Sequence, residues 1–95
     1  NLDSDAMEKI VNKLVNELEA QLAEKKVSIK LTDKARSWLA REGYSPAYGA
    51  RPLSRLIMKE IGDVLTEEIL FGELTKGGEA KIDLKKDKLS FSYTK

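Results

Sequence analysis

The stretch from Gly49 to Pro52, with the sequence GARP, contains the residue types in this chain that could do chemistry. Proline is favoured in the first turn of a helix, so Pro52 places Arg51 at a predicted helix start. A cation is locally unfavourable there, because the helix macrodipole is positive at that end. A bound anion would reverse this, since free backbone amides and a guanidinium would both bind a phosphate. The stretch therefore indicates phosphate binding, with an ordinary solvated arginine as the alternative.

Two further cations, Arg55 and Lys59, follow Arg51 at intervals of four residues. Four residues make about one helical turn, so we expect the three side chains on one side of the helix, opposite an apolar stripe that begins at Leu53. We call these three cations the basic ridge. Such residues commonly cover the solvated side of surface helices, and Gly49 could simply form a tight turn, so both plain alternatives stay open.

The composition excludes most kinds of autonomous catalysis. The sequence contains neither histidine nor cysteine, which removes Ser-His and Cys-His nucleophiles, thiolate metal sites and disulfides. No GxxxxGK[ST] phosphate loop is present, and the Lys76-Gly77-Gly78 turn lacks its glycine spacing and hydroxyl. We therefore expect no metal site and no catalytic residue in the isolated chain. The lack of cysteine favours a cytoplasmic location.

Length and charge limit the remaining classes. Ninety-five residues predict one domain, residues 1–95, with a single core. Seventeen basic and sixteen acidic residues leave a net charge of +1, which argues against nucleic acid or an anionic membrane as a partner. Because every apolar run is far shorter than the roughly 20 residues of a membrane span, we expect no membrane segment and no signal peptide.

The first half of the sequence predicts two helices with a strand between them. Apolar residues recur at steps of three and four over residues 5–25, an amphipathic helix that Ser4 or Asp5 would cap. Residues 27–32 alternate between apolar and polar, as in a half-buried strand. A second helix then starts at Thr32 or Asp33 as its cap, with Trp38 in the core, and ends near Gly43 in the left-handed conformation.

The second half predicts one long helix and a hairpin. The helix opens at Pro52 and ends at Gly72, and Gly62 together with a stripe that rotates about the axis predicts a bend or a second packing partner. Leu56 lies in the middle of that stripe and is expected to be buried. Alternating residues in 80–84 and 89–93 predict a β-hairpin. The fold class is α+β, with three helices packed on a small three-stranded sheet in the order α-β-α-α-β-β.

The run from Trp38 to Ile57, WLAREGYSPAYGARPLSRLI, resembles the sensor-two region of the Clp unfoldase ATPases, in which a GAR-P signature follows a W-L-A-x-x-G-Y helix end. The strand VSIKLT and the stretch EEILFGELTKGG fit the same pattern, so the resemblance extends over nearly the whole chain. Leu70 to Leu74, followed by Gly77 and Gly78, is most similar to the ClpA type. The ClpB and ClpC types share most of the GAR-P region.

This resemblance implies the C-terminal small subdomain, or lid, of a second AAA+ module. In this family the Walker motifs belong to a preceding large subdomain, which would also hold magnesium, and ATP binds where the two subdomains meet. Arg51 matches the sensor-two arginine that reaches the γ-phosphate of ATP. Gly49 and Ala50 match the small residues that let the turn approach the nucleotide, and Arg55 matches a basic position one turn later.

The resemblance also implies partners. The lid would pack against the large subdomain of its own chain and of the neighbouring protomer in a hexameric protein unfoldase, and a Clp peptidase would bind through other parts of the full protein. The chain alone would not hydrolyse ATP. Tyr44 and Tyr48 are expected to shape the signature loop. The alternatives are the lid of a ClpB-like disaggregase, or a freestanding interaction module whose basic ridge binds an acidic partner.

Overall fold

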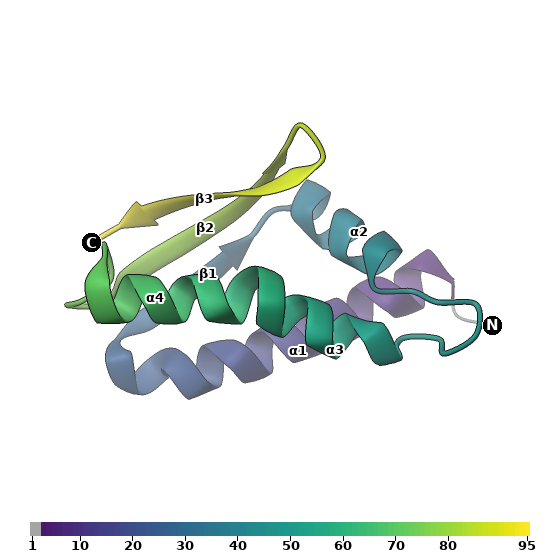
Figure 1. The fold of residues 1–95 in the computed structure, drawn as a ribbon, viewed down its shortest axis with the longest axis horizontal. Coiled ribbons are helices and arrows are strands. Elements are labelled where there is room, and N and C mark those ends of the chain that lie inside the picture. The colour runs from purple at the N-terminus through teal and green to yellow at the C-terminus, as the bar shows by residue number, and fades with distance from the viewer. Residues whose placement is uncertain (1–2) are drawn as a thin grey trace.

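The computed structural model describes residues 3–95, in which three helical stretches cover one face of a three-stranded sheet (Figure 1). The predicted α+β class and element order are confirmed. The elements are α1 (Ser4–Leu22), the 3-10 turn η1 (Ala23–Lys25), β1 (Val27–Leu31), α2 (Asp33–Glu42), α3 (Arg51–Ile57), the π turn η2 (Met58–Gly62), α4 (Asp63–Phe71), β2 (Gly78–Lys85) and β3 (Lys88–Thr94). No helix in this part of the chain is long and apolar enough to cross a membrane.

Helix α1 is capped by Asp3, so the predicted caps Ser4 and Asp5 are wrong. The backbone of Asp3 is extended, and its carboxylate accepts a hydrogen bond from the Ala6 amide at 2.8 Å. Ser4 and Asp5 already have helical backbone, which turns their side chains away from the unpaired amides of the first turn. The apolar face of α1 is buried, as the periodicity predicts, through Met7, Val11, Val15 and Leu18.

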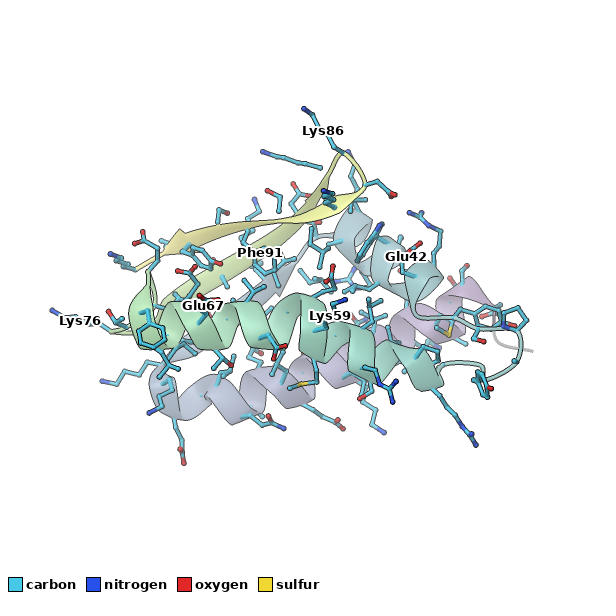
Figure 2. All side chains as sticks on the ribbon, viewed as in Figure 1. Glu42, Lys59, Glu67, Lys76, Lys86 and Phe91 are labelled. Atoms are coloured by element: carbon cyan, nitrogen blue, oxygen red, sulfur yellow. The ribbon has the colours of Figure 1, made fainter. Side chains whose placement is uncertain are left out.

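The sheet has the strand order β1-β2-β3, with β1 parallel to β2 and β2 antiparallel to β3. The predicted hairpin is confirmed, and its two-residue turn places Lys86 and Asp87 at φ of 51° and 61°. This left-handed pair matches the right-handed twist of the flanking strands. In Figure 2, Phe91 on β3 points towards the helices, whereas Lys86 points away from the body of the protein. The hairpin therefore buries one face against the helices.

Helix α2 is tied to the hairpin at its start and in its middle. Thr32 caps it, as predicted, by accepting from the Ala35 amide at 3.2 Å, and its hydroxyl donates to the Asp83 carboxylate at 2.9 Å. Trp38 is buried, and its indole N–H donates to Asp87 at 3.1 Å. The prediction that Trp38 packs in the core is confirmed, because both its ring and its one polar atom have partners within the fold.

The third helical stretch runs without a break through α3, η2 and α4 (Figure 1). Its fully buried residues are spaced by four: Leu53, Ile57, Ile61 and Leu65. Four residues of α-helix advance about 40° beyond a full turn, so this stripe would rotate by about 120° along a regular helix. The π turn, in which the Asp63 amide donates to the Met58 carbonyl, has more residues per turn and cancels part of that rotation. The irregularity predicted near Gly62 is therefore a π turn.

Leu56 is only half-buried, which corrects the prediction that it lies in the middle of the stripe. The stripe follows the four-residue spacing that the π turn permits. Leu56 follows Leu53 by three residues and therefore lies at the edge of the buried face. The sequence pattern places both leucines in the buried stripe, because apolar residues follow Leu53 at a spacing of three and at a spacing of four.

Truncating these two leucines should separate a core position from an edge position. Leu53→Ala removes a fully buried side chain and should lower the free energy of unfolding by about 2–5 kcal/mol. Leu56→Ala, the same chemical change on the same helix, should cost only about 1 kcal/mol because less surface is uncovered. Urea melts of the 95-residue chain measure both. Equal losses would show that the buried face is placed wrongly.

The Asp83 carboxylate should make stability depend on pH. Hydrogen bonds from the Leu84 amide and then from the Thr32 hydroxyl hold the pKa of Asp83 below its ordinary value of 3.8. A lowered pKa means that the ionised form favours the folded state. Its contribution is complete above about pH 4 and is lost as the pH falls through the lowered value. Thermal melts should therefore show a weaker acid dependence for Asp83→Asn than for the unaltered chain, and no such change for the exposed-site control Glu24→Gln.

Candidate functional site

The loop between α2 and α3 brings the signature residues to the end of the molecule where α1 begins (Figure 1). Two backbone hydrogen bonds close it: the Ser45 amide donates to the Gly49 carbonyl at 2.8 Å, and the Gly49 amide donates to the Ser45 carbonyl at 2.6 Å. The Ser45 hydroxyl also accepts from the amides of Ala47 and Tyr48. The loop is therefore held by hydrogen bonds among its own residues, and four of these bonds involve Ser45.

Gly49 occupies a backbone conformation that suits glycine, with φ at 66°. A side chain would strain this left-handed turn, which confirms the plain interpretation of Gly49 as a tight-turn residue. Ala50 follows at the N-cap of α3 and is half-buried against the core. Neither residue puts a polar side chain at the helix start.

Helix α3 begins at Arg51, one residue before the predicted start at Pro52, which becomes the second residue of its first turn. No side chain caps this start, because Ala50 has no hydrogen-bonding group. The Arg51 amide donates to the Tyr48 carbonyl at 3.3 Å, and the Leu53 amide donates to the Ala50 carbonyl at 3.0 Å. Since Pro52 has no N–H, the expectation that free amides of residues 51–53 would bind a phosphate is wrong, and the arginine side chains remain as the donors. Arg51 is exposed, which matches its predicted position on the outer side of the helix start.

A shallow cavity of about 260 Å³ is lined by Tyr48, Arg51, Pro52 and Arg55. Two predicted site residues, Arg51 and Arg55, therefore meet in one place, while Gly49 and Ala50 form the turn beside it. Lys59, the third member of the basic ridge, is exposed but does not line this cavity. Of the basic ridge, the two arginines line the cavity and the lysine does not.

These two guanidiniums have no carboxylate partner within residues 3–95, where the ion pairs are Arg36 with Asp33 and Lys95 with Glu73. An unpaired guanidinium presents five N–H donors, in a geometry that matches phosphate or carboxylate oxygens. The cavity is therefore a candidate anion site. It contains no nucleophile or general base, and residues 3–95 contain no acidic, histidine or cysteine cluster arranged for a metal ion.

Tyr48 is expected from the sequence to shape the loop rather than to stack on a base. Its backbone does help to close the loop, and the residue is also 64% exposed and lines the cavity with Arg51. The signal in the sequence is an aromatic residue directly before a turn glycine, where the chain reverses and the ring cannot reach the core. Tyr44 lies apart, beside a second cavity of about 470 Å³ between the start of α1 and the end of α2.

Comparisons with known proteins agree with this architecture. The family model for the C-terminal, D2-small domain of ClpB protein matches residues 2–82. Chaperone protein ClpB of Brucella suis biovar 1 (strain 1330) is 44% identical over 90 residues, which are 95% of this chain and 10% of that protein. A ClpA homolog protein of Fuscovulum blasticum is 50% identical over 78 residues, 82% of this chain and 10% of the relative.

A third relative, chaperone protein ClpB of Agrobacterium fabrum (strain C58 / ATCC 33970), is 46% identical over 90 residues, again 95% of this chain and 10% of that protein. The chain thus spans about a tenth of the length of the curated relatives it matches. The match to the family model covers the helices and the signature loop, and it ends within β2. On these matches the chain belongs to the Clp-type AAA+ ATPases, as a C-terminal small domain of the ClpB D2-small family.

Proposed function

We propose that residues 1–95 form the lid of the second AAA+ module in a hexameric, ATP-dependent protein unfoldase, and that Arg51 binds the γ-phosphate of ATP held by the large subdomain. The observation that carries this proposal is the exposed Arg51 at an uncapped helix start, in one cavity with Arg55 and without a carboxylate partner in residues 3–95. Membership of the Clp-type family supports it.

The residues at the cavity fit a phosphate chain. Two guanidiniums supply charge, and Gly49 and Ala50, with no side chain and a single methyl group, precede Arg51 in the turn. Bound ATP would supply the phosphoanhydride bond whose hydrolysis drives movement, and the large subdomain would supply its phosphate loop and magnesium. Arg51 would orient the terminal phosphate and neutralise its negative charge, and Arg55 would add to the local positive potential.

The host protein that we propose is of the ClpB chaperone type. The matching family model is that of ClpB, and two of the three relatives described above are named ClpB. The ClpA-type likeness at Leu70 to Leu74 stays a prediction, and the Clp peptidase expected from it has no support in these matches. We propose as partners the large subdomains of the same chain and of the neighbouring protomer, in the cytoplasm. A freestanding module that binds an acidic partner is disfavoured, because the chain matches a small part of much longer proteins.

Removing the Arg51 guanidinium should impair catalysis and leave the fold intact. In the full-length ATPase, Arg51→Ala should lower kcat for ATP hydrolysis by roughly tenfold to a thousandfold, the range expected for one preorganised charge. The melting temperature should stay close to that of the parent, because exposed substitutions change stability by about 0.5 kcal/mol or less. Arg41→Ala, which removes an exposed arginine from α2, is the matched control and should hydrolyse ATP normally. A normal rate for Arg51→Ala, or a collapse of its stability, would exclude the proposed role.

The 95-residue chain by itself should not hydrolyse ATP. It has two cations for the phosphates but neither a phosphate loop nor a metal site in its described part. Its affinity for ATP should therefore be no tighter than about millimolar, near 4 kcal/mol of binding free energy. Isothermal titration calorimetry and a phosphate-release assay test this. Micromolar binding, or turnover that persists through further purification, would contradict the proposal that the large subdomain supplies the phosphate loop and the magnesium.

A further inference from the structure

Gly43, the residue after α2, lies directly against the helix that begins at Arg51. A Cβ atom placed on Gly43 would lie 2.5 Å from Cδ1, 2.9 Å from Cα and 2.9 Å from Cβ of Leu53. Separations below 3 Å are repulsive for carbon atoms, whose optimal distance is about 3.5–4.0 Å. Both residues are buried. Any side chain at position 43 would therefore push the backbone of α3 away from α2.

The backbone angles of Gly43 do not require glycine. Its φ of −89° and ψ of 0° are accessible to other residues, which overturns the sequence prediction of a left-handed helix end. The Gly43 amide donates to the Leu39 carbonyl at 2.8 Å, as any residue could at a helix end. What glycine alone provides is space for Leu53. Glycine at position 43 is therefore explained by the close approach of the two helices, and not by its own backbone conformation.

Arg51 lies between two fixed points. On one side the paired backbone of Ser45 and Gly49 closes the loop, and on the other side Leu53 rests on Gly43. Leu53 is fully buried and comes only two residues after Arg51. A shift of the Leu53 backbone must therefore carry the start of α3, and the Arg51 side chain, with it.

We propose that Gly43 is a positioning residue for Arg51: its missing side chain sets how deeply the start of α3 sits against α2, and so where the guanidinium lies. This inference rests on the proposed function, because it concerns the same anion-binding arginine. Gly43 itself is buried behind the loop and would touch neither the nucleotide nor its metal.

The test compares four forms of the full-length ATPase: the parent, Gly43→Ala, Arg51→Ala and the double variant. Gly43→Ala should lower kcat for ATP hydrolysis by roughly tenfold to a hundredfold, the loss expected when a catalytic group is displaced by about 1 Å. Its KM for ATP should change by about twofold or less. In the double variant kcat should match that of Arg51→Ala alone, since a residue that acts through Arg51 has no effect once the guanidinium is gone.

Gly72→Ala is the matched glycine control. A Cβ at Gly72 would chiefly meet the side-chain carboxylate of Glu68, which can move, and it lies at the far end of α4. Its kcat should equal that of the parent. If Gly43→Ala fails to fold, Leu53→Val tests the same contact by removing the Cδ1 atom that faces Gly43, with Leu65→Val as its control in the other half of the helix. Leu53→Val should lower kcat, and only when Arg51 is present.

The outcomes separate this inference from the proposed function. If Arg51→Ala hydrolyses ATP normally, the proposed function is wrong and the positioning role falls with it. If Arg51→Ala is slow but the altered Gly43–Leu53 contact leaves kcat unchanged, only the positioning role is wrong. The positioning role is also wrong if the losses multiply in the double variant, because Gly43 would then act on the fold as a whole.

Discussion

The long helix from Arg51 to Phe71 must bury residues that are spaced by four along both of its halves. A regular α-helix cannot keep such a stripe against one core, and the π turn from Met58 to Gly62 removes the conflict. The hydroxyl of Thr66 donates to the carbonyl of Gly62, the last residue of the π turn, at 2.8 Å. Because the buried face is fixed in this way, the opposite face is fixed as well, and with it the direction in which the basic ridge points.

The proposed anion site combines two exposed arginines with a rigid support. The support comes from the closed loop at Ser45 and Gly49 and from the packing of Gly43 on Leu53. Under the proposed function, the other groups that bind the nucleotide belong to the large subdomain. A site divided in this way would respond to the angle between the two subdomains.

The sequence predicts those features that follow from local periodicity and single-residue conformational preferences. The hairpin follows from strict alternation, the start of α3 from Pro52, and the tight turn from Gly49, whose φ is 66°. It does not predict features set by contacts between distant segments. The half-buried state of Leu56 depends on the π turn, and Gly43 has its role only because α3 packs against it.

The parallel pairing of β1 with β2 determines the order in which this chain can fold. Thr32, at the end of β1, bonds to Asp83 across 51 residues, and all of α2, α3 and α4 lie between them. Pairings so distant form slowly because a long loop must close first. During synthesis on a ribosome, β1 therefore has no strand partner until β2 has been made. In the finished fold, the Ile29 amide of β1 also donates a hydrogen bond to the Glu19 carboxylate of α1 at 2.6 Å. The two contacts that hold Arg51 both lie within residues 43–53, so neither needs the long loop between β1 and β2 to close first.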